Sequence, residues 1–443
     1  MSTVGQVTPG APPGTPATAT GKDAGRVAFA AFVGTALEWY DYFLFGTASA
    51  IVFNRLYFTT LNPTTATLAS FATFGVGFAA RPIGALVFGW LGDRMGRKPT
   101  LLITVVMIGM ATGLLGVLPG YATIGIAAPL LLVLLRLVQG IAVGGEWGGA
   151  VTLAVEHAPP EKRSWYAALP QVGSPVGTLL SSGAFSLVLL LPSGSFDSWG
   201  WRLPFLLAFP LMGIAVYIRR RVEESPLFDE MMEHNEQAKV PALDVFRKAW
   251  GRLLIAIASA TLGVGGFYML TTFMISYGAD TLGLPRSLMV NGTLVAAVVE
   301  IAVIIVVGRM ADRLGPGRVM LWGGLFSAVL AFPVFWLVET KNPFVVVLAM
   351  TVGVAVLSIA YAVSGALLAD LFPAQLRYTG VALSYNLAGA LTGFLPFLAT
   401  ALLAAGGGAS WPAALLLMVL SLITALGGLL GARMREKDNV TIV

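Results

Sequence analysis

The stretch GWLGDRMGRK at positions 89–98 recurs in a shorter form as GRMADRLG at positions 308–315. Asp93 in the first copy and Asp312 in the second are separated by 219 positions, about half of the 443-residue chain. Self-similarity at a long, fixed offset indicates a fold built from repeated units. The chain is therefore predicted to consist of two related halves.

A second, independent pattern supports this duplication. An acidic residue, followed by proline three positions later and arginine seven positions later, begins at Glu156 and again at Asp370, 214 positions further on. Two unrelated motifs that recur at nearly the same offset are hard to produce by chance. We expect each motif to occupy an equivalent loop of each half.

The composition is that of a membrane protein. Hydrophobic residues make up 57% of the chain and charged residues only 11%, which leaves too little polar surface to cover a soluble globule of this length. A helix that crosses a bilayer needs about 20 mostly apolar residues. Twelve stretches fit: 27–53, 66–90, 100–118, 127–155, 164–191, 200–219, 252–279, 287–307, 318–338, 343–368, 379–404 and 410–432.

These stretches are continuous, whereas the strands of a membrane barrel are alternating segments of about ten residues. The predicted fold class is an all-α membrane protein with twelve transmembrane helices in two pseudo-symmetric six-helix bundles. The predicted organisation is a disordered cytoplasmic tail (1–26), an N-terminal bundle (27–219), a cytoplasmic linker (220–250), a C-terminal bundle (251–433) and a second cytoplasmic tail (434–443).

The positive charges predict the orientation, because basic loops stay in the cytoplasm. With both termini cytoplasmic, 21 of the 27 lysines and arginines fall on the cytoplasmic side. We therefore expect a multi-pass protein of the inner (cytoplasmic) membrane. The net charge of +5 reflects this orientation, and no basic patch is interleaved with aromatic residues, so no nucleic-acid partner is expected. The remaining basic residues are Arg55, Arg202, Arg286 and Lys341 outside, and Arg81 and Arg136 within the membrane.

Several classes of function are disfavoured by what the sequence lacks. The chain has no cysteine, which excludes a disulfide framework and thiolate metal sites. Both histidines, His157 and His234, fall in predicted cytoplasmic segments, and no His-Glu-x-x-His pattern is present. The first 25 residues lack the charged start and apolar core of a signal peptide. We expect neither an enzyme nor a metal protein.

Ionisable residues inside membrane helices are candidates for function, because burying them in lipid is costly. The carboxylates within predicted spans are Glu38 and Asp41 in the first, Glu146 in the fourth and Glu300 in the eighth. If the protein carries protons, one of these carboxylates is the carrier, since no histidine lies in the membrane. Glu300 has no recognisable motif around it.

Several motifs resemble a known family. Positions 89–98 resemble the signature loop of the major facilitator superfamily, and RLVQG (136–140) resembles its fourth-helix motif. Within that superfamily, four further stretches are similar to the metabolite:proton symporters, which include shikimate, α-ketoglutarate and proline/betaine permeases, with the shikimate-permease branch nearest. These stretches are LEWYDY (37–42), RPIG (81–84), GGEWGG (144–149) and WGWRLPF (199–205).

The resemblance implies a secondary transporter whose two halves rock around a central site. It implies a symporter that imports a small organic acid, such as shikimate or a dicarboxylate, together with a proton. The expected partners are that solute, the proton and the lipid bilayer; the protein is expected to work as a monomer, without a cofactor, driven by the proton gradient. The alternatives are a proton-coupled antiporter or exporter, and a symporter of a zwitterion such as betaine or proline.

One face of the first helix suggests how a proton is coupled to the solute. Glu38, Asp41 and Tyr42 share that face at helical spacing, and Asp41 and Arg136 are placed to meet across a central cavity. Our hypothesis is that protonation of Asp41 releases Arg136 to hold a carboxylate of the substrate. The alternative is that these residues only tie two helices together; Glu146 likewise serves either coupling or helix packing.

The wall of the solute site is predicted to combine polar and aromatic side chains in an apolar pocket. The resembled fold places the relevant positions on helices that line the cavity, although ordinary packing is an alternative for each one. The candidates are Trp39, Tyr42, Arg136, Gln139, Gln171, Tyr268, Tyr361 and Asn386.

The repeated loop motif is predicted to form a cytoplasmic gate rather than a solute site. The resemblance implies that Asp93 sits at the positive N-terminal end of the eleventh helix, near Thr379; the alternative is a plain positive-inside anchor. Pro316 and Gly317 replace the last basic residues in the second copy, which predicts a weaker gate there. The gate candidates are Gly89, Asp93, Arg94, Gly96 and Arg97 in the first copy, and Asp312 and Arg313 in the second.

Overall fold

The computed structural model describes residues 21–95, 97–144, 146–147, 151, 154–155, 158, 160–220, 245–247 and 249–441. Within these ranges the chain forms helices and turns and no strand, as predicted. Glu156, both histidines and most of the predicted linker lie outside the described residues.

The first half contains helices that correspond to the first six predicted spans. They are α1 (Gly21–Ala48), the π-helical turn η1 (Ser49–Phe53), α2 (Asn54–Leu56), α3 (Pro63–Met95), α4 (Arg97–Val117), α5 (Tyr121–Ile124), α6 (Ala127–Val143), the 3₁₀ turn η2 (Pro160–Lys162), α8 (Arg163–Ala168), the 3₁₀ turn η3 (Pro170–Val172), α9 (Gly173–Val188), α10 (Ser193–Ser198), the 3₁₀ turn η4 (Gly200–Arg202), α11 (Leu203–Leu206) and α12 (Ala208–Arg220).

The second half begins with a span that alternates α-helical and π-helical turns. It comprises α15 (Trp250–Thr261), η5 (Leu262–Gly266), η6 (Met269–Phe273), α16 (Met274–Ser276) and η7 (Tyr277–Thr281). The other five spans follow as longer helices: α17 (Arg286–Leu314), α18 (Pro316–Glu339), α19 (Pro343–Leu371), α20 (Ala374–Thr392) with α21 (Leu395–Ala405), and α22 (Trp411–Thr441).

The lengths of these helices fit a membrane protein. Among the described residues, eight runs of helix are long and apolar enough to cross a membrane, and two shorter apolar helices, Leu102–Val117 and Ala127–Val143, fall in the third and fourth spans. The two other predicted spans, the first and the fifth, are not among these eight runs. The first contains the polar carboxylates Glu38 and Asp41, and the fifth is divided by the 3₁₀ turn η3, which begins at Pro170.

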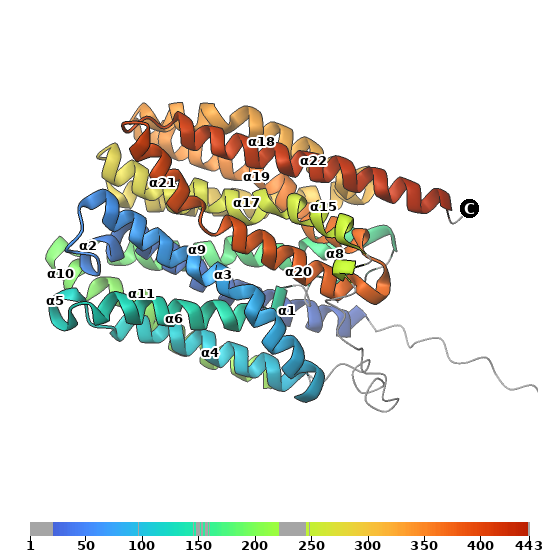
Figure 1. Ribbon diagram of the computed structural model, residues 1–443, viewed down its shortest axis with the longest axis horizontal. Helices are drawn as coiled ribbons and strands as arrows, with labels where there is room; N and C mark the ends of the chain where they lie inside the picture. Colours follow the sequence, from blue (N-terminus) through green and yellow to red (C-terminus); the bar gives the residue numbers. More distant parts are fainter. Residues whose placement is uncertain are drawn as a thin grey trace, which may run out of the picture.

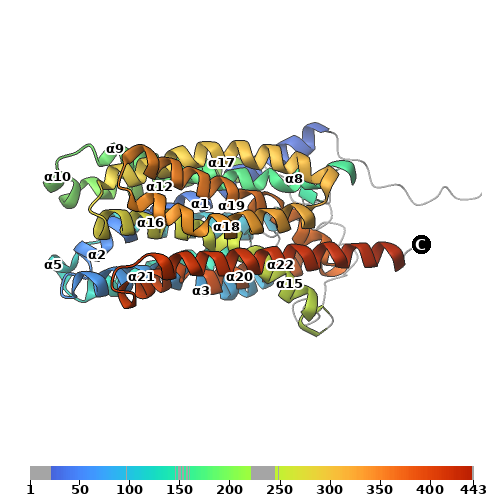
Figure 2. The same ribbon diagram turned by 90° about the horizontal axis from the view of Figure 1, so that it is seen from above.

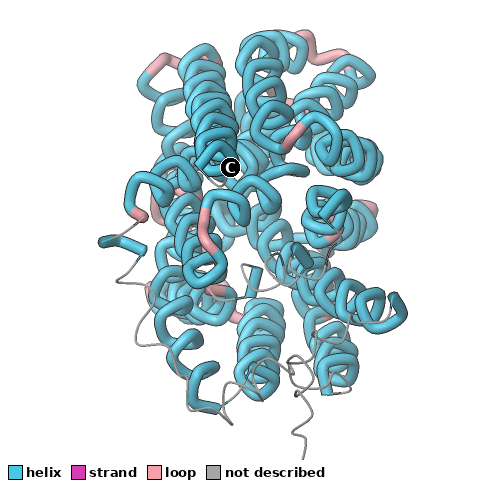
Figure 3. The backbone as a smooth tube through the Cα atoms, turned by 90° about the vertical axis from the view of Figure 1, so that its right-hand side faces the viewer, coloured by secondary structure: helices cyan, strands magenta, loops and turns pink. Residues whose placement is uncertain are grey.

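The helices run along the long axis of the molecule, as the view down that axis in Figure 3 shows. In Figure 1 the helices α4 and α6 lie along one side, the orange and red helices α18, α19 and α22 along the other, and α3, α9, α17 and α20 between them. Each half therefore contributes helices to a seam through the middle of the protein. Across this seam, the Thr293 hydroxyl of α17 donates a 2.9 Å hydrogen bond to Ser182 of α9.

The start of α1 and the end of α22 lie at the same end of the molecule (Figures 1 and 2). We call this the terminal end. The opposite end carries the short helices α2, α5 and α10.

Glycines let α3 and α6 approach each other closely. A Cβ atom placed on Gly140 of α6 would lie 2.0 Å from the carbonyl oxygen of Gly77 in α3, and one on Gly144 would lie 2.2 Å from the carbonyl oxygen of Arg81. Small residues at such crossings allow membrane helices to pack backbone against backbone. The close contact brings Arg81 and Arg136, one from each helix, into the same layer of the protein.

We predict that Gly140→Ala destabilises the protein, because its methyl group collides with the α3 backbone and forces the two helices apart. Overpacking of this kind costs about 1–3 kcal/mol, so the thermal unfolding temperature of the purified protein should fall by several degrees. Gly213→Ala in α12 is the matched control, since a Cβ there meets nothing within 4 Å. Equal unfolding temperatures for the two variants would contradict the close packing.

Candidate functional site

Two carboxylates on one face of α1 meet two arginines from the neighbouring helices. The Arg81 Nη2 atom of α3 lies 3.3 Å from Oε1 of Glu38, and the Arg136 Nη1 atom of α6 lies 3.7 Å from Oδ2 of Asp41. All four side chains are at most 3% exposed. The meeting of Asp41 and Arg136 agrees with the expectation from sequence, whereas the pairing of Glu38 with Arg81 was missed.

A signal for this second pair is present in the sequence. Arg81 and Arg136 are the two basic residues assigned to the membrane interior, and two carboxylates of the first span lie on one helical face. Because an unpaired charge in a membrane is costly, two arginines and two carboxylates at similar depth should be matched as two pairs.

Asp41 lies at the centre of a polar network. Its Oδ1 atom accepts a 2.5 Å hydrogen bond from Nε2 of Gln139 and a second hydrogen bond from the hydroxyl of Thr112 in α4. The Gln139 Oε1 atom in turn accepts a 3.3 Å hydrogen bond from Nη1 of Arg136. Gln139, expected in the solute wall, is thus placed against the proposed proton carrier, and Thr112 is a member of the network that sequence reasoning missed.

Aromatic rings surround both guanidinium groups. The Arg136 Cζ atom lies 4.5 Å from the ring centre of Tyr42 and 4.3 Å from that of Phe45, and Arg81 Cζ lies 4.2 Å from that of Tyr42. The Tyr42 hydroxyl also accepts a 2.9 Å hydrogen bond from Nε of Arg81. The faces of such rings attract cations and replace part of the lost hydration. Tyr42 therefore joins the two ion pairs.

Room for the guanidinium group of Arg136 comes from a glycine. A Cβ atom on Gly77 would lie 2.5 Å from Nε of Arg136. The same guanidinium donates from Nε to the Phe74 carbonyl oxygen at 3.4 Å, one turn earlier in α3.

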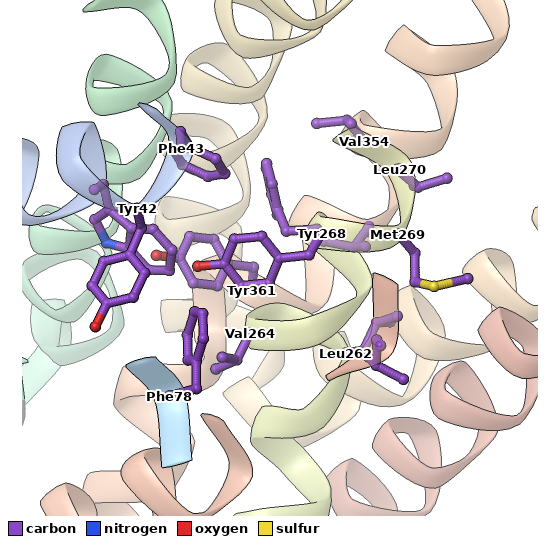
Figure 4. Packing of buried hydrophobic residues seen from close by; sticks show 14 of the residues in the cluster. Tyr42, Phe43, Phe78, Leu262, Val264, Tyr268, Met269, Leu270, Val354 and Tyr361 are labelled. Atoms are coloured by element: carbon purple, nitrogen blue, oxygen red, sulfur yellow. The ribbon is translucent and has the colours of Figure 1, made fainter. Parts of the chain in front are cut away.

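The two halves meet next to these ion pairs in an aromatic cluster (Figure 4). Its centre is Tyr268 of the seventh span, whose ring lies 5.1 Å from Phe78 of α3 and 6.5 Å from Trp39 of α1. Trp39 is also 6.4 Å, edge to face, from Tyr361 of α19. All of these rings are buried, so the solute-wall candidates Trp39, Tyr42, Tyr268 and Tyr361 gather at one place and close it off from solvent.

Several buried donors in and around this cluster have no hydrogen-bond partner, and three of them flank the ion pairs and the ring of Tyr268. These three are Nε1 of Trp39, the hydroxyl of Tyr268 and Nη2 of Arg136. A buried polar group left without a partner costs about 1–3 kcal/mol, and such groups are rare enough in folded proteins that each needs an explanation. A polar ligand between the halves would satisfy them.

The candidates Gln171 and Asn386 join the two halves on the terminal-end side of the cluster. Nε2 of Gln171 donates to the carbonyl oxygen of Tyr361 at 3.2 Å and to Oγ of Ser364 at 2.8 Å. Nδ2 of Asn386 in α20 donates to the carbonyl oxygen of Gly144 at 2.6 Å. In this conformation both amides hold the halves together.

A stacked aromatic pair that was not predicted from the sequence also holds the two halves together. Trp147 and Tyr385 have ring centres 3.5 Å apart at an angle of 14°, and the indole Nε1 of Trp147 donates to Gln171 at 3.0 Å. Trp147 follows Glu146 directly, within the GGEWGG motif.

One cavity is lined by three of the candidate carboxylates. It lies between α1, α4 and α12, and Glu38, Asp41 and Glu146 line it together with apolar residues such as Ile108 and Met212. Glu146 is partly exposed, in contrast to the two buried carboxylates of α1. The cavity therefore offers a place for water next to the Asp41 network.

The second copy of the loop motif contacts the first half at the terminal end. Oδ1 of Asp312 accepts hydrogen bonds from the backbone nitrogens of Ser164 at 2.8 Å and Trp165 at 3.3 Å, at the start of the fifth span. A carboxylate is favoured there by the exposed N–H groups of the helix end. Arg163 lies 3.9 Å from Asp370, so the duplicated acidic and basic motifs also pair across the seam. Arg313 is exposed.

The first copy of the motif is only partly described. Gly89, Asp93 and Arg94 belong to the end of α3 and Arg97 begins α4, but the surroundings of their side chains and the whole of Gly96 lie outside the described residues. The contact of Asp93 with the eleventh helix therefore stays a prediction.

These features define a class of protein: a multi-pass helical membrane transporter whose halves enclose a polar and aromatic centre. The family model of the Major Facilitator Superfamily matches residues 31–356 and 293–441. The chain belongs to this superfamily, and it is a transporter rather than an enzyme.

Curated relatives are similar along most of their length. The chain is 39% identical over 410 residues to the shikimate transporter of Escherichia coli, covering 91% of this chain and 94% of that protein. It is 40% identical over 380 residues to an inner membrane metabolite transport protein of the same organism, covering 83% and 84%. The proline/betaine transporter of Salmonella typhimurium is 32% identical over 423 residues, covering 93% and 83%.

Solved structures show the same fold. A crystal structure of a D-xylose-proton symporter superposes with a TM-score of 0.72 at 18% identity, covering 92% of this chain and 96% of that one.

We predict that the pair Glu38 and Arg81 is energetically coupled. Glu38→Gln leaves a buried arginine without its counter-charge and should cost about 3–5 kcal/mol, whereas Glu38→Gln combined with Arg81→Gln should cost clearly less than the sum of the single changes. Thermal unfolding of the unchanged protein, the two single variants and the double variant in one detergent completes this double-mutant cycle. The half-exposed pair of Arg55 and Asp197 is the control, since surface pairs contribute about 0–1 kcal/mol. Purely additive changes in stability would contradict the energetic coupling of Glu38 and Arg81.

Proposed function

We propose that the protein is a proton-coupled symporter that imports a small organic acid by alternating access. The observation that carries this proposal is the buried pair of Asp41 and Arg136, which lies beside donors that lack partners at the seam of the two halves. The names of the relatives support an organic acid, with shikimate as the first candidate. The terminal end is proposed to face the cytoplasm of the cell, with the protein in the cytoplasmic membrane.

The proposed coupling is local and electrostatic. While Asp41 is ionised, its Oδ2 neutralises Arg136 at 3.7 Å. When Asp41 takes up a proton, that attraction is lost, and the guanidinium group, which remains charged, is available to a carboxylate of the solute. Gln139 is placed to follow the change, because it donates to Asp41 and accepts from Arg136.

The aromatic cluster is proposed to hold the body of the solute. The ring faces of Trp39, Tyr268 and Tyr361 offer an apolar surface, while the indole N–H of Trp39 and the hydroxyl of Tyr268 can bind hydroxyl or carboxylate oxygens. Sites for small molecules typically combine apolar walls with a few polar groups that fix orientation. An alicyclic acid with several hydroxyl groups matches this arrangement.

The contacts near the terminal end are proposed to be the gate. Gln171, Asn386 and Asp312 each bond across the seam, and these bonds must break when the site opens towards the cytoplasm. Glu38, Asp41 and Glu146 line one cavity, through which water can deliver the proton.

We predict that Asp41→Asn uncouples transport from the proton gradient. Proteoliposomes containing this variant should no longer concentrate radiolabelled shikimate against its gradient under an inwardly directed pH gradient, yet they should still exchange internal for external shikimate. The neutral amide cannot change its charge, so the driving force is lost while binding persists. Asp197→Asn, at the opposite end of the molecule, is the control and should accumulate shikimate normally.

Normal proton-driven accumulation by Asp41→Asn would exclude Asp41 as the carrier. Loss of shikimate export, rather than loss of uptake, when the inwardly directed pH gradient is dissipated would identify an antiporter instead.

We predict that Tyr268→Phe weakens solute binding without destabilising the empty protein. The hydroxyl has no partner in the structure, so its removal should leave the unfolding temperature unchanged or slightly higher, while the apparent Kd for shikimate rises about tenfold, as expected for one hydrogen bond of about 1–1.5 kcal/mol. Thermal shift with and without shikimate measures both effects. A lower unfolding temperature of the empty protein together with unchanged affinity would assign the hydroxyl a purely structural role.

A further inference from the structure

Glu300 is a buried carboxyl group that the coupling scheme above does not use. It lies near the middle of α17 and is 0% exposed, and neither Oε1 nor Oε2 has a hydrogen-bond partner. Its environment therefore differs from that of Asp41, which has an arginine, a glutamine and a threonine around it.

The position of Glu300 along α17 places it on the seam between the halves. Thr293, seven residues earlier, donates to Ser182 of α9 at 2.9 Å. A Cβ atom on Gly308, eight residues later, would lie 2.7 Å from Cβ of Ala168 in α8. Seven or eight residues are about two helical turns, so Thr293, Glu300 and Gly308 share one face of α17. That face lies against the fifth span of the other half.

The surroundings of Glu300 supply no counter-charge among the described residues. The helix α9 has no ionisable side chain, and η3 has none. The hydroxyl of Tyr361 on α19 interacts electrostatically with Glu300. The other titratable residue of α19, Asp370, lies near the end of that helix and faces Arg163. The charged residues of α8 and α17 lie towards the ends of the seam: Arg163, Arg286, Arg309, Asp312 and Arg313.

A carboxylate ion without a partner is strongly disfavoured in so dry a place, whereas the neutral acid is tolerated far better. In the alternating access proposed above, the seam between the halves separates and closes in every cycle, which would move this carboxyl group between a dry and a wetter environment.

We propose that Glu300 is a second proton-binding site, which is protonated whenever the seam between α17 and the fifth span is closed and releases its proton to water when the seam opens. In the reverse step the carboxylate takes a proton from hydronium, giving the neutral acid and water, as the seam closes. The proposal rests on the alternating access proposed above but not on the role of Asp41. It links proton binding to the movement of the halves themselves.

Infrared spectroscopy of the protein in lipid tests the chemical state of the group. The wild type at neutral pH should show the C=O stretching band of a protonated carboxylic acid that Glu300→Gln lacks and that Glu300→Asp retains at a shifted position. Asp41→Asn should keep the Glu300 band, which separates this result from failure of the coupling proposed for Asp41. Absence of a band assignable to Glu300 at neutral pH would overturn the proposal.

A distance measurement tests the link to movement. Because the chain has no cysteine, spin labels can be attached uniquely to Leu190→Cys and Ser287→Cys, two exposed positions on either side of the seam at the opposite end. As the pH rises, the distance distribution should shift over the same range in which the Glu300 band disappears. This shift should persist with Asp41→Asn and be lost with Glu300→Gln. A shift that is the same in Glu300→Gln and in the otherwise unchanged protein would refute the linkage.

Discussion

The structure depends on how four buried charges are kept inside a membrane. A single charged side chain at the centre of a spanning helix costs about 2.5–3.5 kcal/mol even on the mildest scales, and Glu38, Asp41, Arg81 and Arg136 lie within one layer of the first half. Pairing and aromatic contacts reduce that cost. Because each pair joins α1 to another helix, the positions of α3 and α6 relative to α1 follow from this requirement.

Close packing of α3 against α6 is also needed to pair these charges. The arginines reach α1 together because α3 and α6 touch at Gly140 and Gly144, where a Cβ atom would collide with the α3 backbone, and because Gly77 leaves room for the side chain of Arg136. The RLVQG and GGEWGG motifs thus have a packing role. Each combines polar residues with a glycine that lets the backbones of two helices come close together. Replacing the glycines would separate the charges even if every charged residue were kept.

Much of this arrangement can be predicted from sequence, and the limits have physical causes. Apolar length fixed the number of spans, and the scarcity of intramembrane charges pointed to Asp41 and Arg136, because few partners are available in lipid. The bridging roles of Gln171 and Asn386 were not predictable in the same way. Helical spacing places a side chain on the face towards the cavity, but whether that side chain meets a solute or the other half depends on how far the halves have closed.

The two halves are similar in their helices but differ in their buried charged residues. The first half contains two complete ion pairs, whereas the described spans of the second contain one deeply buried carboxyl group, Glu300, which has no counter-charge. A paired carboxylate responds to whatever competes for its arginine, such as an anionic solute. An unpaired one responds only to the polarity of its surroundings, which here means the closure of the seam. Under the two proposals above, the two copies of one fold would sense two different events, the arrival of the solute and the position of the halves.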